Sequence, residues 1–310
     1  MKVLITGSSG FLGTFLHESL LREGNEVIAL NSHTCDLRNP HALSAFDNFP
    51  LDRIFHLAAW TQAGDFCLHH PGEQWIINQK INTHVLEWWL QKQPQAKLIA
   101  IGTSCSYDPN LPLHEDYYLQ GQPIDSLFTY AMTKRMLLTG LIALSKQFDL
   151  EYLYLIPSTL YGPGYHTDGR QMHFIFDLIR KILRGKWYNE PVELWGDGEQ
   201  KRELVHVRDF VAALLQLTEK EKCTHINIGS GKEYSIKQFA SMICELVDYP
   251  NEAIVFNQDK YVGARSKVLQ TEKLSQPLPD FNWIDLQTGL KETIDWFTAS
   301  REHFFPQRAH

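Results

Sequence analysis

The sequence lacks the features that would place the protein in a membrane or on a nucleic acid. No apolar run approaches the length of a membrane span. The opening Met-Lys-Val-Leu-Ile-Thr-Gly is too short and too soon interrupted to resemble a signal peptide. The formal net charge is -7, whereas binding to a phosphate backbone needs a basic surface. We therefore expect a cytoplasmic protein with neither a membrane nor a nucleic acid as its partner.

Cysteine is also scarce, and its spacing argues against two further classes of protein. The five cysteines are odd in number and show no metal-ligand spacing. Reduced thiols and no bound metal are therefore expected, rather than a disulfide framework. The 310 residues are 44% hydrophobic and 21% charged, which is typical of a globular chain with a sizeable core.

Short apolar runs alternate with helical patterns through the first half of the chain. The expected strands are at 2–6, 27–30, 54–57, 98–101 and 152–156, and the expected helices at 11–20, 77–90 and 130–145. The strands lack polar alternation, as strands buried on both faces do. This pattern predicts an α/β fold with a Rossmann-type, doubly wound parallel sheet.

The pattern loosens from about Ser158, where strands become shorter and helices are expected near 171–184, 209–218 and 236–247. We interpret residues 1–157 as a dinucleotide-binding domain. Residues 158–310 are then a smaller α+β substrate lobe, from which the segment at about 203–218 returns to the first domain.

A glycine-rich turn joins the first predicted strand to the first predicted helix. Gly7, Gly10 and Gly13 form the pattern G-x-x-G-x-x-G. Such a turn lets backbone N–H groups and a helix N-terminus approach a pyrophosphate. Glycine also serves in plain turns, but its place directly after an apolar strand favours a dinucleotide. The predicted cofactor site here also includes Ser9, Phe11 and Leu12.

The end of the second strand bears on the choice of cofactor. It reads Asn31-Ser32-His33, with no acid to accept from a ribose 2′-hydroxyl and no arginine for a 2′-phosphate. The missing acid favours NADP weakly, and NAD is the alternative. Asp36 and Leu37, which follow, are expected near the adenine.

A tyrosine and a lysine lie one helical turn apart in Tyr130-Ala-Met-Thr-Lys134. A lysine ammonium in that position can lower the pKa of the phenol and make it an acid or base near neutral pH. The pair could equally be a chance surface pair. It follows a strand that ends in Thr103 and Ser104, however, whose hydroxyls could orient a substrate oxygen beside the phenol. The order of these motifs favours catalysis.

Together these motifs resemble those of the extended short-chain dehydrogenase/reductase family over nearly the whole chain. The matching segments are Gly7-Ser-Ser-Gly-Phe-Leu-Gly13, His56-Leu-Ala-Ala59, Asn78, Thr103 before Tyr107, Tyr130 with Lys134, Leu160-Tyr-Gly-Pro163 and Arg202-Glu-Leu-Val-His-Val-Arg-Asp209. The resemblance implies a nucleotide-sugar substrate and a catalytic triad of Thr103, Tyr130 and Lys134. It also implies cofactor contacts from Lys134 and from Leu57, Ala58 and Ala59, and a homodimer formed through the helix that bears Tyr130.

Within the family, the chain is most similar to the branch that epimerises and reduces GDP-4-keto-6-deoxymannose with NADPH. The similar segments are Gly102-Thr-Ser-Cys-Ser-Tyr107, Val192-Glu-Leu-Trp-Gly-Asp-Gly198 and Ile226-Asn-Ile-Gly-Ser-Gly231. By this resemblance, Cys105 and His173 fall on the acid/base pair of the epimerisation. Carbons beside a ketone have acidic C–H bonds, and inversion needs a proton acceptor and a proton donor on opposite faces. A thiol beside a cationic group can take either part.

The chain departs from that branch at several positions. Thr159 stands where the family has asparagine, and residues 165–172 differ. Neutral Ser9 and Ser32 replace the arginines that hold the 2′-phosphate of NADP. The resemblance therefore implies a GDP-linked sugar but fixes neither the sugar nor the cofactor.

Each remaining assignment has a structural alternative. Cys105 could be a small core residue and His173 a histidine on a helix surface. Arg202 and Lys267 are candidates for the diphosphate of the substrate, or ordinary surface cations. Trp195 could lie against the base or the sugar, or in the core.

Three functions are compatible with these residues. The first is an NAD(P)H-dependent reductase of a nucleotide-linked 4-keto-6-deoxy sugar, with epimerisation at C3 or C5. The second is a 4-epimerase or 4-dehydrogenase that retains NAD and does not need Cys105 and His173. The third is a non-catalytic dinucleotide sensor, against which the intact Tyr130 and Lys134 count.

Overall fold

The computed structural model describes residues 1–166, 168, 170–260 and 265–304. A six-stranded sheet lies at its centre, in the order β2-β1-β3-β4-β5-β9, and every strand runs parallel to its neighbours. The strands are β1 (Lys2–Thr6), β2 (Glu26–Leu30), β3 (Arg53–His56), β4 (Lys97–Ile101), β5 (Tyr152–Pro157) and β9 (Thr224–Ile228).

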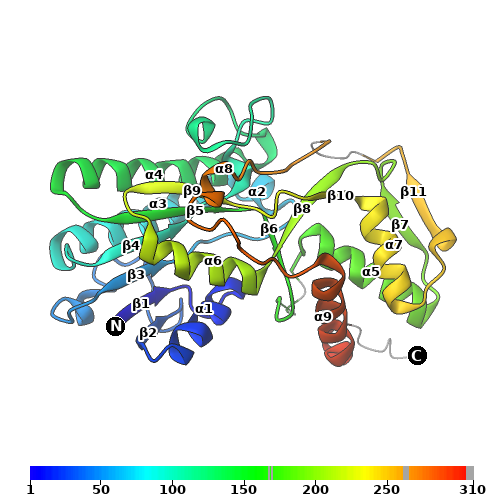
Figure 1. Ribbon diagram of the computed structural model, residues 1–310, viewed down its shortest axis with the longest axis horizontal. Helices are drawn as coiled ribbons and strands as arrows, with labels where there is room; N and C mark the ends of the chain where they lie inside the picture. The colour runs from blue at the N-terminus through cyan, green and yellow to red at the C-terminus, as the bar shows by residue number, and fades with distance from the viewer. Residues whose placement is uncertain (167, 169, 261–264, 305–310) are drawn as a thin grey trace.

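Alternate residues of the central strands pack against different pairs of helices, because successive side chains of a strand point to opposite faces. Val3 shares a buried cluster with Phe210 of α6, whereas its neighbour Leu4 shares one with Leu137 of α4. The helices that pack against the central sheet are α1 (Phe11–Arg22), α3 (Pro71–Lys92), α4 (Phe128–Phe148) and α6 (Val207–Lys220). Helices α1 and α6 cover one face of the sheet, and α3 and α4 cover the other (Figure 1).

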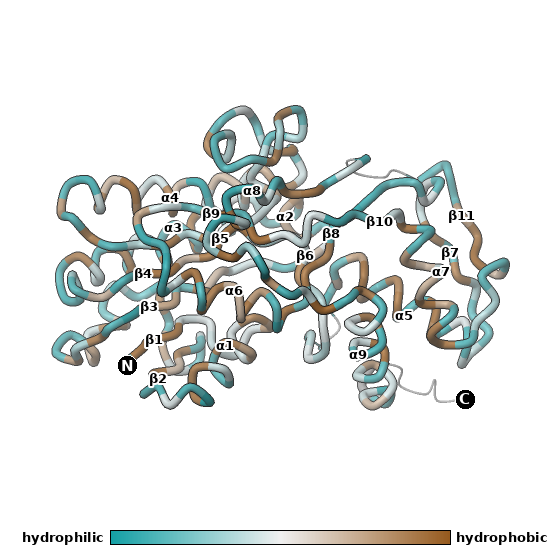
Figure 2. Tube along the Cα trace, viewed as in Figure 1, coloured by the Kyte–Doolittle hydropathy of each residue, from teal (hydrophilic) through white to brown (hydrophobic). Residues whose placement is uncertain are grey.

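This double coverage explains why the strands read as continuous apolar runs. Val3, Leu4 and Ile5 are all fully buried although they point to both faces. In Figure 2 hydrophobic colouring follows the strands at the centre of the sheet. The predicted Rossmann-type, doubly wound sheet is confirmed.

The second part of the molecule combines two small sheets with three helices. One sheet has the order β10-β8-β6, and the other pairs β11 with β7. The elements are β6 (Thr159–Tyr161), β7 (Val192–Trp195), β8 (Lys201–His206), β10 (Glu233–Ser235), β11 (Ile254–Asn257), α5 (Phe174–Tyr188), α7 (Ile236–Val247) and α9 (Leu286–Ala299). Apolar side chains of α5, α7 and α9, among them Ile179, Phe239 and Phe297, form its buried core.

The chain crosses between the two parts more than once. After β8, helix α6 lies against α1, and β9 then joins the central sheet beside β5. Figure 1 shows β6 and β8 in the middle of the molecule, between the central sheet and the β7/β11 sheet. The proposed boundary at residues 157 and 158, and the assignment of 158–310 as the substrate lobe, stay predictions.

The remaining helices are one turn long: α2 (Phe66–His69), α8 (Glu272–Ser275) and α10 (Arg301–Phe304). Within the described ranges, no helix combines the length and apolar character needed to cross a bilayer. No group of three histidine, cysteine or acidic side chains that could hold a metal occurs in the same ranges.

Candidate active site

The turn between β1 and α1 leaves no room for side chains at two of its glycines. Gly7 has a φ of +72°, and a Cβ there would lie 2.9 Å from the backbone nitrogen of Ala58. A Cβ on Gly13 would lie 2.2 Å from the carbonyl oxygen of Gly7. The glycines therefore let the turn, the start of α1 and the segment after β3 pack backbone against backbone.

The N-terminus of α1 suits an anion. Gly10 is the N-cap residue, and no side chain caps the first turn. Ser9 and Gly10 are exposed, and Phe11 and Leu12 are partly exposed. Helix N-termini present unpaired N–H groups and a positive dipole end, which together favour a phosphate. The residues of this turn thus fit the pyrophosphate of a dinucleotide.

The segment after β3 completes this edge of the sheet. The backbone N–H of Ala58 donates to Thr6 Oγ1 at 3.2 Å, and Asn78 binds both polar backbone groups of Trp60. Leu57, Ala58 and Ala59 are held beside the glycine turn in this way and remain partly exposed.

The loop after β2 contains a charged pair that the sequence analysis missed. The guanidinium of Arg38 donates to both carboxylate oxygens of Asp36, at 2.7 to 3.0 Å. These hydrogen bonds lower the pKa of Asp36. Leu37 is buried, and its carbonyl is 2.8 Å from Nδ1 of His84. No arginine occurs at 31–33, but one stands five residues further on.

Residues 104–106 form a single 3-10 turn at the end of β4. Thr103 Oγ1 caps this turn by accepting from the N–H of Cys105 at 3.2 Å. Ser106 ties the turn to α4, since its hydroxyl donates to the carbonyl of Ala131 at 3.1 Å. Ser104 is buried beside them. The turn is thereby fixed against the helix that carries Tyr130 and Lys134.

Lys134 lies close to Tyr130 without bonding to its hydroxyl. Its ammonium donates to the carbonyl of Ile101 at 2.8 Å and lies 5.9 Å from the centre of the Tyr130 ring. Burial lowers the pKa of Lys134 to about 8. Burial, and the charges of Cys105 and Tyr118, raise the pKa of Tyr130. The expectation that Lys134 lowers the phenol pKa is wrong for this structure, because the ammonium is directed to the end of β4.

Cys105 faces the second part of the molecule, where it meets Lys267. The ammonium of Lys267 is 3.0 Å from the sulfur. Partial burial raises the pKa of the Cys105 thiol, but the charge and hydrogen bond of Lys267 more than offset this, with help from Thr103 and Arg202. The net effect is a lowered pKa, as is typical of a thiol beside cations.

His173 immediately precedes α5, at its N-cap position. Protein atoms around the ring, and the charge of Lys267, lower the pKa of His173, although the side chain stays open to solvent. Lys267 therefore acts electrostatically on both Cys105 and His173. Lys267 contacts Cys105 directly, whereas His173 is affected only through the charge of Lys267.

The other predicted substrate residues have different surroundings. Thr159 opens β6, where it pairs with Leu204 of β8. Arg202 lies on β8 and is partly exposed. Trp195 ends β7 with 55% of its surface exposed, so the interpretation as a core tryptophan is wrong.

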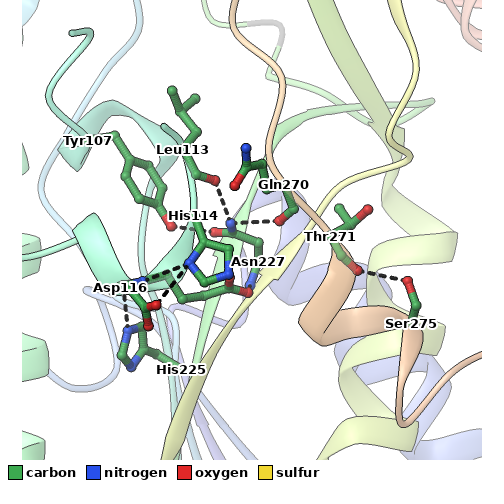
Figure 3. A network of polar contacts seen from close by, with 10 residues as sticks. Tyr107, Leu113, His114, Asp116, His225, Asn227, Gln270, Thr271 and Ser275 are labelled. Carbon is green, nitrogen blue, oxygen red and sulfur yellow. Dashed lines mark hydrogen bonds and ion pairs between the residues drawn. The ribbon is translucent and has the colours of Figure 1, made fainter. Parts of the chain in front are cut away.

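Two buried polar residues near the site were not identified from the sequence. Glu203 accepts from the backbone N–H of Leu269, and Asn227 donates to the carbonyl of Gln270 (Figure 3 shows Asn227). The only signal in the sequence was their place inside motifs whose other members drew attention. A carboxylate or amide in a strand gives no hint of which distant backbone it binds.

The chain is similar to proteins of known family and fold. Residues 3–229 match the family described as "NAD dependent epimerase/dehydratase family". Over 98% of both chains, the sequence is 28% identical to the GDP-L-fucose synthase of Escherichia coli (strain K12). It is also 28% identical to the dTDP-4-dehydro-6-deoxy-D-allose reductase of Streptomyces bikiniensis, with 95% of each chain covered. The fold is similar to that of the NADP-bound GDP-L-fucose synthetase from Naegleria fowleri, with a TM-score of 0.86 and 23% identity over 97% of this chain and 95% of that one.

Proposed function

The chain belongs to the NAD dependent epimerase/dehydratase family, as its motifs predicted, and we propose that it reduces a nucleotide-linked 4-keto-6-deoxy sugar. We further propose that it epimerises the same sugar at C3, C5 or both before reduction. The observation that carries this proposal is the 3.0 Å contact between the Lys267 ammonium and the Cys105 sulfur beside the turn of Thr103, with His173 within electrostatic range of the same lysine. A simple 4-epimerase has no use for a thiol held beside a cation at this turn.

The residues that would hold the cofactor are those of the glycine turn and its neighbours. Gly7 to Gly13 offer the pyrophosphate a helix N-terminus, and residues 57–59 flank the turn. Lys134 lies further along the same edge, beyond the end of β4. NADPH, when bound, supplies a hydride to the carbonyl carbon of the substrate. We propose NADP as the weakly preferred cofactor, with NAD as the alternative.

The raised pKa of Tyr130 suits a proton donor. A phenol that keeps its proton at neutral pH can give it to the C4 oxygen as the ketone becomes an alcohol. The hydroxyl of Thr103, two residues from Cys105 on the adjoining turn, orients the same oxygen in this proposal. Ser104 forms part of the same turn, and its side chain is buried.

Epimerisation begins with a proton acceptor beside the ketone, whereas reduction needs a proton donor. The Cys105 sulfur takes the proton from the carbon next to C4, so that a C–H bond breaks and an S–H bond forms. The electron pair left on carbon passes into the carbonyl as an enolate. A proton returned from the other face, where we place His173, gives the inverted carbon. Because the C–H bond is acidic only while C4 is a ketone, inversion precedes reduction.

We propose that the nucleotide diphosphate binds on the side of Arg202, a residue suited to bidentate contact with phosphate. The exposed face of Trp195 offers a surface for the base or the sugar. The GDP-linked sugar in the name of the Escherichia coli relative, GDP-L-fucose synthase, makes GDP the first nucleotide to test. Thr159 lies on β6 and is a candidate for a sugar hydroxyl.

A homodimer remains part of the proposal. Phe128 and Met136 are exposed on α4, the helix expected to meet a second copy, and Trp75 and Ile76 are exposed on α3, which packs against it. Light scattering in solution tests this, and a monomer at micromolar concentration would contradict it.

The proposed activity is tested with synthetic GDP- and dTDP-linked 4-keto-6-deoxy sugars. Loss of NADPH absorbance reports reduction, and NMR of the product reports the configuration at each carbon. Incubation in deuterated water without NADPH then reports exchange at C3 and C5. Reduction without exchange identifies a plain 4-reductase. Tightly retained NAD, with interconversion of C4 epimers and no net NADPH use, would favour the 4-epimerase.

A further inference from the structure

Lys267 reaches across the molecule to the sulfur of Cys105, 162 positions earlier in the chain. The sequence suggested a contact with the substrate diphosphate for this lysine. We propose instead that Lys267 is a positioning residue that holds Cys105 as a thiolate before any substrate binds. The inference rests on the proposed function for its chemical purpose, since a thiolate accepts a proton from carbon without first losing one to water.

The surroundings of the sulfur favour the ionised form. Two cations, Lys267 and Arg202, act on it, and Thr103 supplies a further hydrogen-bonding group. The two acidic neighbours that interact with it, Tyr130 and Cys67, both have raised pKa values and so keep their protons at neutral pH. His173 is the other titratable group near Lys267, and it adds no negative charge there in either protonation state. The charge nearest to the sulfur is therefore positive.

Buried hydrogen bonds fix the segment that carries Lys267. The carboxylate of Glu203 accepts from the backbone N–H of Leu269 at 3.0 Å and from that of Gly231 at 2.7 Å. The amide of Asn227 donates to the carbonyl of Gln270 at 2.9 Å. The backbone that carries this flexible lysine is thus held two and three residues after it.

The same Asn227 holds the segment that carries Cys105. The hydroxyl of Tyr107 donates to Asn227 Oδ1 at 2.7 Å, and Figure 3 shows Tyr107 and Gln270 bonded to this one side chain. Tyr107 is two residues from Cys105, and Gln270 is three residues from Lys267. One buried amide therefore links the two backbones whose side chains meet as thiol and ammonium.

The test measures the thiol alone, without substrate or cofactor. The rate of alkylation by iodoacetamide is followed against pH, and the peptide that holds Cys105 is quantified by mass spectrometry so that exposed Cys223 does not interfere. Only the thiolate reacts, so the midpoint of the profile reports its ionisation. We expect the wild-type midpoint to lie below that of N-acetylcysteine measured alongside. A midpoint at or above that of N-acetylcysteine overturns the proposal without reference to any variant.

Three substitutions assign the effect to the charge of Lys267. Lys267→Met should slow alkylation of Cys105 at neutral pH by about tenfold or more, because an opposite charge within contact distance is lost. Lys267→Arg should retain the fast rate. Lys201→Met is the matched control, since Lys201 lies in the same region but pairs with Glu233, and it should leave the rate unchanged.

Equal profiles for Lys267→Met and the wild-type protein would overturn the proposal, as would an equal change in the control. Circular dichroism spectra establish that each variant is folded. The result is separate from the proposed function. A protein that reduces no 4-keto sugar can still show the low midpoint, and an active reductase can lack it.

Discussion

The two sides of the candidate active site are built differently. Thr103, Tyr130 and Lys134 stand on a strand end and a long helix, which Ser106 ties together by its bond to α4. His173, Arg202 and Lys267 come instead from a helix start, a strand of a small sheet and an irregular segment. Lys267 meets Cys105 across 162 positions of the sequence. The first side is a local arrangement supported by regular structure, whereas the second exists only because distant segments meet.

This difference separates the two proposed reactions. Reduction depends on the side whose geometry follows from β4 and α4. Epimerisation depends on contacts between the two sides, above all that of Cys105 with Lys267. Substitution of Tyr130 should therefore abolish reduction, and substitution of Cys105 or Lys267 should slow epimerisation and spare reduction.

The largest effect is expected for Tyr130→Phe, which removes only the phenolic proton. Reduction of the 4-keto sugar should fall by about 100- to 10,000-fold, the usual contribution of a positioned acid. NADPH binding, measured by fluorescence titration, should be unchanged. Tyr188→Phe, at the end of α5, is the control and should retain full activity. Ordinary turnover by Tyr130→Phe would remove this residue from the proposed mechanism.

Cys105→Ser should separate the two reactions. Deuterium exchange into C3 or C5 should slow by about 100- to 1,000-fold, because the proton acceptor is lost. Reduction of a sugar that already has the product configuration should continue. Cys223→Ser alters an exposed cysteine and serves as the control. If the wild-type protein reduces the ketone but exchanges no deuterium, Cys105 and His173 only shape the sugar pocket.

The same comparison explains what the sequence could predict. The glycine turn and the Tyr130/Lys134 pair are local patterns, and their place after apolar strands indicated both the sheet and its edge. The contact of Lys267 with Cys105 depends on how two segments 162 positions apart are brought together in the fold. No spacing of residues in the sequence predicts it. The pairing of Cys105 and His173, which came from family position, stays a prediction, and the sequence left Lys267 between a diphosphate contact and a surface cation.

The pKa of Tyr130 could not be predicted from the sequence either. The Tyr130/Lys134 spacing is right for a charge effect on the phenol, yet the carbonyl of Ile101 binds the ammonium. Burial then decides the pKa of Tyr130. The exposure of Trp195 was also not predictable from the sequence, because it depends on how β7 pairs with β11 in a small sheet.

Acid should destabilise the first side through His56. Burial lowers the pKa of this histidine to about 4, opposed by its hydrogen bond with Asn82 and reinforced by the charge of Lys134. The unfolded chain therefore binds a proton at a pH where the folded chain does not. The contribution of neutral His56 to the free energy of unfolding is therefore fully present above about pH 6.5. It declines by about 3 kcal/mol in all as the pH falls towards about 4.

Urea denaturation at several pH values measures this effect. His56→Gln should reduce the dependence of the unfolding free energy on pH in that window. His173→Gln, on the second side, should change it less, because the ring is open to solvent. Equal slopes for His56→Gln and the wild-type protein would contradict the assignment.

The glycine turn should tolerate no side chain at Gly13. A Cβ there meets the backbone of Gly7 and Ser8, which cannot move away without shifting the turn. We expect Gly13→Ala to lower the unfolding free energy by about 1 to 3 kcal/mol and to weaken NADPH binding. Gly72→Ala, in the first turn of α3, is the control, since a methyl group at that position would meet nothing within 4 Å. Normal stability and normal NADPH affinity of Gly13→Ala would show that the turn can accommodate a side chain at this position.

The smallest expected effect concerns the choice of cofactor. Asn31 uses its side-chain oxygen to accept from the backbone N–H groups of His33 and Thr34, so the loop presents neither an acid nor a free cation directly after β2. The protein should therefore prefer NADPH over NADH by less than about tenfold. Arg38 is the nearest arginine in the loop, and Asp36 already binds it. Asp36→Asn should release Arg38 and increase the preference for NADPH, whereas Arg38→Ala should reduce it. Fluorescence titrations of both cofactors measure these ratios. A wild-type preference of several orders of magnitude would contradict this interpretation of the loop, and unchanged ratios in both variants would place the ribose away from Arg38.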